Sequence, residues 1–545
     1  MVFPASLFAF MERFNLRNGL LSGLEFNVVT ALIVGVGFHV FRRVLGFLKI
    51  FKTVSYFPKV YTAFEPFALP GVLLPTTSWN TGYDWHWVRR SQTYNRNETV
   101  NLVPILGGKA VLWTSNMDIG KQVAAGGHRS SFVKPETASG AFLLWGMSLA
   151  AADGNMWRKH RRVVGPAFGT ELYKLVWKQT AQTYQDMLEV DGWKNQDIVD
   201  VPVIQKVTSK LAFLIISTCG FGFPSTWATP PKSADGEMPV QEALRVVAET
   251  HLLALTLPRW LMHLPIPRFK TARIARDRLA AFMQGQVTER KAEVASGGDT
   301  RADAFTMLVK ANQDESSKFQ LDDSELIGNV FLFMFAGHET TAHTLAGTLA
   351  FMAINQDVQD EVVEQIMSVV GTERDPEYDD YSKLDKVLAI FYESARMFPA
   401  GHVLIREATE DTILTVPNPV GEEGNRTVPI PKGGQVIVDM VGVQYNPRYF
   451  EDPEMYKPSR WYGLPSDSEL FTAFSVGPRA CIGRRFATTE ATCFLALLLR
   501  DWKVTPILRD GESHDAWGKR VLNAHIVLTL GIGDIPVRFT RRKRS

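Results

Sequence analysis

The chain has 545 residues, of which 46% are hydrophobic and 21% are charged, so it is long enough to bury an extensive core. Its 59 lysines and arginines nearly balance 57 acidic residues, and the formal net charge of +2 excludes the strong basic bias typical of nucleic-acid-binding proteins. Three cysteines cannot build a disulfide framework, so Cys219 and Cys493, in apolar helical patterns, are predicted to be core thiols in a reducing compartment.

The first predicted element is an apolar segment from Leu24 to Phe41, about the shortest length that can span a bilayer. Basic residues follow it, at Arg42, Arg43, Lys49 and Lys52. A positive flank on this side favours a cytosolic location for the rest of the chain. A cleaved signal peptide is the alternative, but its basic region would precede the apolar run. We therefore predict a single-pass membrane anchor within residues 1–52.

The next stretch, residues 53–80, is punctuated by prolines and is predicted to be a stiff connector. Its prolines are Pro58, Pro66, Pro70 and Pro75. Fixed φ angles and missing N–H donors resist regular structure. Residues 81–545 then show mostly helical periodicity with a few short strand-like runs. The predicted fold class is mainly α with small β-sheets.

A basic helical pattern contains Trp157 and Arg161, an aromatic residue and an arginine one turn apart. Further basic residues lie beside them or near the cysteine described below, at Arg158, Lys159, Arg162, Arg484 and Arg485. This charge would suit an acidic partner protein, and it is equally compatible with ordinary solvated side chains.

The longest predicted helix begins at a capping cluster, Asp323 to Glu325, and continues to about Asn355. It is apolar nearly all round, which predicts a buried helix. Polar residues interrupt it in the stretch 336–341, Ala-Gly-His-Glu-Thr-Thr. Thr340 and Thr341 could bond back to helical carbonyls and bend the helix, or the interruption could serve a function.

A later helix ends before Pro399 and carries Glu393 and Arg396 on one face. By itself this i, i+3 spacing indicates little more than a surface ion pair. The strand-like run that follows contains Arg406.

The most informative stretch is Phe474 to Gly483, which places Cys481 in a glycine-framed turn before an apolar helix. Gly477 and Gly483 permit backbone angles and close approaches that a β-carbon would block. Arg479 and the N–H groups of the following helix are predicted to favour the thiolate form of Cys481. A metal ligand is therefore expected here.

This stretch resembles the haem-binding loop of the cytochrome P450 family and matches each of its fixed positions. Those positions are Phe474, Gly477, Arg479, Cys481 and Gly483. The resemblance implies the P450 fold, haem b as cofactor and Cys481 as the axial thiolate of the haem iron. It extends over nearly the whole chain.

The same resemblance assigns roles along the long helix and around the haem. Ala336 and Gly337 would leave room for dioxygen, and Glu339 and Thr340 would be the acid–alcohol pair that relays protons to it. Haem propionates would bind Trp157, Arg161 and Arg406, and a buried structural triad would comprise Glu393, Arg396 and Arg460. The distal pocket would be lined by Phe331, Phe335, Val403, Leu404 and part of 128–149, with His402 as its obvious polar group.

The resemblance implies a monooxygenase that inserts one oxygen atom of O₂ into a hydrophobic substrate. Electrons would come from NADPH through a separate NADPH–cytochrome P450 reductase, aided by cytochrome b5, because the chain shows no flavin or nicotinamide motif. Anchored relatives reside in the endoplasmic reticulum membrane and face the cytosol.

The sequence around 445–449 and 457–461 resembles fungal members of the family, which favours a terpenoid substrate in secondary metabolism. Fatty acids and aromatic xenobiotics are alternative substrates. Two other classes stay open: a haem-dependent isomerase or dehydratase that needs no reductase, and a non-catalytic haem sensor.

Overall fold

The computed structural model describes residues 30–31, 33–38, 41–46, 56–90, 97–125, 129–139, 143, 145–223, 225–228, 237–240, 242–243, 246–247, 250, 261–297, 301–313, 318–418, 422–465, 468, 470–526 and 529–543. Much of the predicted anchor, residues 1–52, therefore lies outside the described residues. The described parts of 30–46 are helical. Within the described ranges, no helix combines the length and apolarity that crossing a bilayer requires.

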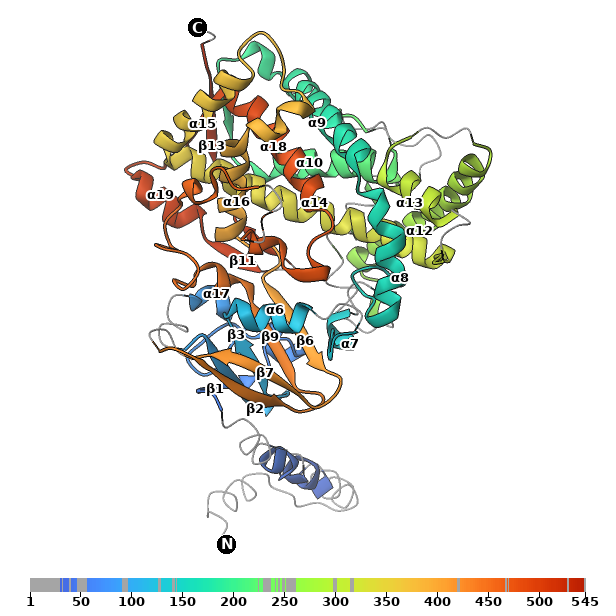
Figure 1. Ribbon diagram of the computed structural model, residues 1–545, viewed down its shortest axis with the longest axis vertical. Helices are drawn as coiled ribbons and strands as arrows, with labels where there is room; N and C mark the ends of the chain where they lie inside the picture. The colour runs from blue at the N-terminus through green and yellow to red at the C-terminus, as the bar shows by residue number, and fades with distance from the viewer. Residues whose placement is uncertain are drawn as a thin grey trace, which may run out of the picture.

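Helices dominate the architecture, as the sequence predicted (Figure 1). The α-helices are α3 (Leu69–Leu73), α4 (Trp85–Val88), α6 (Met117–Ala125), α7 (Glu136–Ser139), α8 (Gly154–Val164), α9 (Thr170–Val190), α10 (Gln205–Ile215), α12 (Pro267–Ala295), α13 (Ala304–Gln313), α14 (Asp323–Ile354), α15 (Gln356–Val369), α16 (Asp385–Met397), α17 (Met440–Gln444), α18 (Arg484–Asp501) and α19 (His514–Val521).

The strands form one six-stranded sheet and three small ones. They are β1 (Lys59–Phe64), β2 (Thr99–Gly107), β3 (Val111–Thr114), β4 (Phe132–Val133), β5 (Ile198–Val201), β6 (Val403–Ala408), β7 (Thr412–Pro417), β8 (Asn425–Ile430), β9 (Gln435–Asp439), β10 (Trp502–Pro506), β11 (Ala524–Ile526), β12 (Leu530–Ile532) and β13 (Val537–Arg541). The large sheet has the order β1-β2-β3-β9-β6-β4; the others are β10-β13-β5, β11-β12 and β7-β8. Figure 1 shows the large sheet at the same end as the N-terminal helix, away from the C-terminus.

The proline-rich segment 53–80 is more regular than predicted. Strand β1 pairs in parallel with β2, with Lys59 opposite Asn101, and so belongs to the large sheet. Helix α3 carries Pro70 in its first turn, where a missing N–H removes no helical hydrogen bond. The expectation of an irregular connector is therefore wrong for these two elements, because the prolines lie where strand and helix tolerate them.

Helix α14 runs through the middle of the helical region and organises the core (Figure 1). Asp322 caps its first turn: the side chain accepts from the Glu325 N–H at 2.9 Å, and the Glu325 carboxylate accepts from the Asp322 N–H at 2.9 Å. Most of its side chains are buried, and α10, α16 and β10 pack against it. The predicted start and buried character of this helix are confirmed.

Candidate active site

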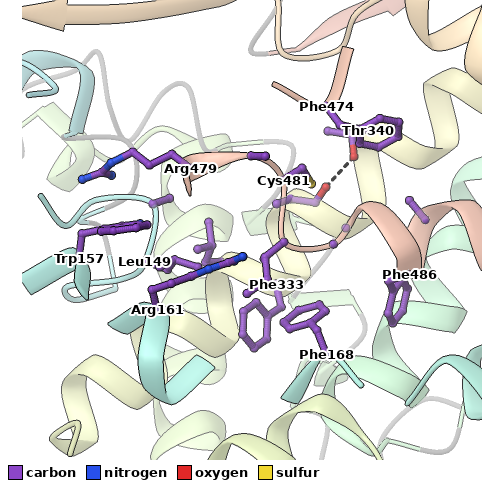
Figure 2. A pocket seen from close by; sticks show the side chains of 18 of the residues that line it. Leu149, Trp157, Arg161, Phe168, Phe333, Thr340, Phe474, Arg479, Cys481 and Phe486 are labelled. Atoms are coloured by element: carbon purple, nitrogen blue, oxygen red, sulfur yellow. Dashed lines mark hydrogen bonds between the residues drawn. The ribbon is translucent and has the colours of Figure 1, made fainter. Parts of the chain in front are cut away.

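A cavity of about 300 Å³ opens beside Cys481, between the cysteine loop and α14. Ten of the residues singled out from the sequence line it: Trp157, Arg161, Ala336, Gly337, Thr340, Arg406, Phe474, Arg479, Cys481 and Gly483. They come from α8, α14, β6 and the loop before α18, which are far apart in the sequence. Figure 2 shows Cys481, Thr340 and Arg161 around this space.

The cysteine loop is held by its own backbone. The Cys481 N–H donates to the Phe474 carbonyl at 2.9 Å, and the Ala480 N–H donates to the Gly477 carbonyl at 3.0 Å. Gly477 has a φ of 73°, a left-handed conformation that a side chain would strain. Gly483 caps α18 with a φ of −84°, and a β-carbon there would lie 4.0 Å from the Cys481 sulfur. The conformational requirement for glycine thus holds at Gly477 and not at Gly483.

The Cys481 side chain is exposed to the cavity, and its surroundings act on the pKa of its thiol in opposite directions. Burial raises its pKa, and this outweighs the lowering by the N–H groups of Gly483 and Arg484 and by the charges of Arg484 and Arg161. The sequence predicted the helix end correctly as a source of donors. It could not predict the desolvation, which comes from elements distant in the chain.

Helix α14 forms the wall opposite the sulfur. Ala336 is open to the cavity, while a β-carbon on Gly337 would lie 2.9 Å from the Ile216 side chain in the π-helix η5 (Ile216–Gly220). Gly337 therefore gives close packing of α14 on η5 as well as space in the cavity. The Thr340 hydroxyl donates to the Ala336 carbonyl at 2.7 Å, the dashed contact of Figure 2.

Glu339 was predicted to act beside Thr340, but the structure places its side chain outside the cavity lining. Its carboxylate is not part of the cavity lining; it accepts a hydrogen bond from the Thr529 hydroxyl at 2.8 Å on another side of α14. Successive helical residues are about 100° apart, so Thr340 and Glu339 cannot share one face. The two members of the predicted acid–alcohol pair therefore point in different directions.

A cluster of cations forms one edge of the cavity. Arg479 donates to the Ala152 carbonyl at 2.9 Å and to Asp153, and its guanidinium lies 4.9 Å from the centre of the Trp157 ring. The sequence analysis missed Lys134, which bonds the Ala150 and Ala152 carbonyls beside this cluster. No motif marked this lysine, although it lies within the segment 128–149 that was expected to line the distal pocket.

One carboxylate, that of Asp153, acts on Lys134, Arg406 and Arg479. Burial, with help from the charges of Arg479 and Arg406, lowers the pKa of Lys134 to about 7 against the opposing effect of Asp153. Burial likewise lowers the pKa of Arg406 to about 10, reinforced by Arg479. No acidic side chain is among the described residues that line the cavity. The edge therefore carries an excess of positive charge that an anionic ligand would neutralise.

This donor set fits haem. A thiol faces the cavity for the iron, the walls are apolar, and the cationic edge suits two carboxylates. Lys134, Trp157, Arg161, Arg406 and Arg479 are the residues that would hold the propionates. When bound, the iron supplies the redox chemistry of oxygen activation. The protein contributes a water-excluding apolar chamber, a sulfur ligand and the Thr340 hydroxyl on the facing helix.

Glu393 and Arg396, both on α16, form a buried network with Arg460 of the segment 457–461. Arg396 donates twice to the Glu393 carboxylate, both at 2.9 Å, and Arg460 donates to it at 3.1 Å. The Trp461 indole and the Lys457 N–H complete its coordination at 2.8 and 2.9 Å. The arrangement positions the segment 457–461 against α16, and none of Glu393, Arg396 and Arg460 is part of the cavity lining.

Of the predicted distal residues, Leu149, at the end of the segment 128–149, lines the cavity, whereas Phe331, Phe335, Val403 and Leu404 are not part of its lining. Phe331 packs on Trp145 with ring centres 4.9 Å apart and stacks with Phe335. Val403 and Leu404 pack against other apolar clusters near the large sheet. The predicted polar group, His402, is buried with its Nδ1 2.9 Å from His86 Nε2, so that expectation is wrong.

Apolar residues that were not predicted also line the cavity, namely Phe168, Ile216, Leu332, Phe333 and Phe486. Helical spacing could have identified one of them. Phe333, Gly337 and Thr340 are separated by four and three residues and therefore share a helical face. Nothing in the local sequence marks Phe168 or Phe486, which reach the cavity through tertiary packing.

Three comparisons agree on what the chain is similar to. Residues 101–524 match the family model described as Cytochrome P450. Cytochrome P450 monooxygenase 124 of Postia placenta is 34% identical over 76% of this chain and 80% of its own length. The cyclooctat-9-en-7-ol 5-monooxygenase of Streptomyces melanosporofaciens is 26% identical over 67% of this chain and 74% of its own. The crystal structure of the cytochrome P450DA heme domain superposes with a TM-score of 0.64 at 20% identity, covering 82% of this chain and 90% of that one.

Proposed function

Because the chain belongs to the cytochrome P450 family and is a haem-thiolate monooxygenase, we propose that it hydroxylates a hydrophobic terpenoid with electrons from a separate NADPH–cytochrome P450 reductase. The observation that carries the substrate proposal is the apolar wall of the cavity. Beyond the cationic edge, its walls are formed by aliphatic and aromatic side chains, and Thr340 and Thr341 supply the hydroxyls. Such a chamber stabilises a substrate mainly by excluding water from apolar surface.

Relatives support the terpenoid class as the first candidate to test. Several similar proteins are fungal monooxygenases, and one bacterial relative is named for oxygenating cyclooctat-9-en-7-ol, an apolar alcohol. Fatty acids and polycyclic aromatics are the competing classes, since they would bury comparable apolar surface in the same chamber.

Electron supply is proposed to use the face that carries α8. Arg158 and Arg162 are exposed there and would attract an acidic donor such as the reductase or cytochrome b5. Arg484 and Arg485 are less available, since Arg485 lies 3.6 Å from the centre of the Tyr381 ring and Arg484 rests on Phe471. Docking of an acidic electron donor should therefore depend on the basic residues of α8 more than on those of α18.

We propose that the protein is held at the endoplasmic reticulum membrane with its catalytic domain in the cytosol. Exposed apolar side chains at the sheet end of the molecule support this, led by Leu73 at 72% and Trp79 at 59% exposure. Ile105 and Leu106, at the end of β2, are also exposed, at 49% and 54%. Apolar surface of this kind is unfavourable in water and favours contact with a bilayer.

A spectral titration tests the substrate proposal. The full-length holoprotein in reductase-free membranes is titrated with sesquiterpenes, triterpenes, fatty acids and polycyclic aromatics, after its reduced carbon monoxide spectrum has verified thiolate ligation. A high-spin shift confined to one terpenoid class, followed by reductase-dependent hydroxylation of that compound, is the expected result. Shifts with fatty acids or aromatics alone would contradict the terpenoid proposal, and product formed without reductase would indicate an isomerase.

A further inference from the structure

A second pocket, of about 380 Å³, lies between α15 and the strands β10 and β13. Figure 1 shows α15 and β13 near the C-terminus, at the end of the molecule away from the large sheet. The end of α18 contributes Arg500 and Asp501 to the lining. Among the described residues, this lining and that of the cavity beside Cys481 have no member in common, so the two are separate sites.

One wall of this pocket carries basic side chains that strand pairing brings together. Lys503 of β10 is directly opposite Thr540 of β13 in the antiparallel register, so their side chains lie side by side on one face of the sheet. Arg542 and Lys543 follow β13 and also line the pocket. The Arg542 N–H donates to the Asp501 carbonyl at 2.8 Å, which fixes the chain beside the end of α18. Lys503, Arg542 and Lys543 are called the cationic wall below.

Two further arginines of the lining already have acidic partners. Arg500 pairs with Asp375 at 2.8 Å and with Asp501 at 3.0 Å. Arg541 Nε lies 3.6 Å from Asp197, and its Nη2 donates to backbone carbonyls before β5. These two arginines therefore serve the fold, and the proposal below does not depend on their charge.

The charges of the cationic wall are less well compensated. No acidic side chain among the described residues forms an ion pair with Lys503 or Lys543. Arg542 Nη1 lies 3.7 Å from Asp360 Oδ1, and its buried Nε–H has no hydrogen-bond partner in the described part of the chain. Burial lowers the pKa of Arg542 against the opposing effect of Asp360. An anion in the pocket would stabilise this guanidinium and would meet two unpaired ammonium groups.

The opposite wall of the pocket is apolar. Val363 and Met367 are four residues apart, so they share one face of α15, and both line the pocket and are half-buried. Thr372, just after α15, adds a hydroxyl group at the edge. A ligand would therefore meet charge on one side and apolar surface on the other. The volume exceeds the 300 Å³ beside Cys481, so the pocket has room for more than a single inorganic ion.

We propose that this pocket binds a nucleoside diphosphate, with the phosphates at the cationic wall and the base against the apolar face of α15. Lysine, arginine and hydroxyl groups are the donors that bind phosphate oxygens in proteins. Three cations favour a ligand with more than one negative charge, which a simple carboxylate does not supply. A flat base can remove the half-buried side chains of α15 from water. The inference is independent of the haem site and of the proposed monooxygenase function.

The first test measures binding and does not depend on turnover. Purified full-length holoprotein is equilibrated by dialysis against ADP, AMP or inorganic pyrophosphate at constant ionic strength. We expect saturable binding of one ADP per protein, with weaker binding of AMP, which has fewer charges, and of pyrophosphate, which has no base. The absence of saturable ADP binding would overturn the proposal. Pyrophosphate bound as tightly as ADP would also overturn it, because the site would then recognise phosphate alone.

The second test changes the two walls separately. Lys503→Gln and Lys543→Gln should each weaken ADP and pyrophosphate about tenfold, because each removes a charge-assisted contact with phosphate. Met367→Gln keeps every charge and should weaken ADP more than pyrophosphate. Lys519→Gln is the matched control, since this exposed lysine of α19 is outside the pocket lining and its loss changes the net charge equally. It should leave ADP binding unchanged.

Two results of the variants would refute the proposal. Wild-type affinity for ADP in both lysine variants would remove the cationic wall from the site. An equal loss of affinity in Lys519→Gln and Lys503→Gln would show attraction by net charge rather than by the pocket. The haem spectrum and the thermal unfolding midpoint verify the fold of each variant. Lys543 is exposed and lies beyond β13, so its replacement decides the question even where Lys503→Gln lowers stability.

Discussion

Two glutamates on helices that pack together, Glu393 on α16 and Glu490 on α18, are both 0% exposed and have opposite surroundings. Glu393 accepts hydrogen bonds from two arginines, an indole and a backbone N–H. Glu490 has no hydrogen-bond partner on either oxygen among the described residues. The comparison shows two ways of burying a carboxyl group: surround the charged form with donors, or remove the charge.

Burial raises the pKa of Glu490 to about 8, so this residue keeps its proton near neutral pH. Glu393 instead accepts hydrogen bonds from Arg396, Arg460 and the Trp461 indole. A buried charge that loses its partners costs far more than a buried neutral acid, so the same substitution should have unequal effects at the two positions.

The largest effect is expected for Glu393→Gln. It leaves Arg396 and Arg460 without their carboxylate, and breaking a buried pair costs about 3 to 5 kcal/mol. The free energy of unfolding should fall by this amount, and haem content per protein should collapse. Denaturant unfolding and the haem absorbance ratio measure both. Glu171→Gln, which breaks an exposed pair with Lys174, is the control and should change stability by less than about 0.5 kcal/mol.

The effect of Glu490→Gln on the free energy of unfolding should depend strongly on pH. Since the folded pKa lies above the ordinary value of 4.5, the stability that protonated Glu490 provides is fully present below about pH 4.5 and is lost as pH rises through about 8. The glutamine variant has no such slope. It should match wild type near pH 5 and be roughly 2 to 4 kcal/mol more stable near pH 9. Equal unfolding curves of the two proteins at both pH values would show that Glu490 titrates normally.

Lys134 is a buried cation, in contrast to the two glutamates, and its expected partner is a haem propionate. Lys134→Gln would remove one charge-assisted bond to a propionate, worth about 1.5 to 3 kcal/mol, so haem should dissociate roughly 10-fold to 150-fold faster. Transfer of haem to an excess of apomyoglobin measures the rate. Lys121→Gln on the exposed surface of α6 should leave it unchanged. Equal rates in all three proteins would remove Lys134 from the propionate site.

The smallest change in stability is expected for Thr340→Val. The Thr340 hydroxyl bonds only a helical carbonyl of its own helix in the described structure, so its loss should alter the free energy of unfolding by less than about 1 kcal/mol. Thr344→Val removes the same kind of bond, 2.9 Å to the Thr340 carbonyl, outside the cavity. Only Thr340→Val should increase peroxide release per NADPH. Equal peroxide release by the two variants would assign Thr340 the structural role alone.

The predictable parts of this molecule were those encoded within one short stretch. The loop around Cys481 and the helix with Ala336 and Thr340 each carry their signal within a few residues, whereas burial of the Glu393–Arg396 pair was expected only from the family resemblance. The direction of Glu339 relative to Thr340 follows from the helical period, but its hydrogen-bond partner Thr529, 190 residues away, was not predictable. The same holds for Glu490 and Lys134, whose desolvation is created by packing of distant elements.

The pocket lining was predicted least well for a related reason. Phe331 and Phe335 were preferred over Phe333, although the helical period places Phe333 on the face of Gly337 and Thr340. The position of His402, in contrast, could not have been predicted from a local pattern, because its partner, His86, is 316 residues away.

The cationic edge formed by Lys134, Arg161, Arg406 and Arg479 also determines which porphyrins the apoprotein accepts. Like charges brought together in a poorly solvated site repel one another until two carboxylates arrive, so binding of the diacid is favoured by relief of that repulsion. A porphyrin whose carboxylates are esterified brings the same apolar ring and no compensating charge. The polypeptide therefore discriminates haem from its diester by electrostatics at the rim, independently of the iron and of the thiolate.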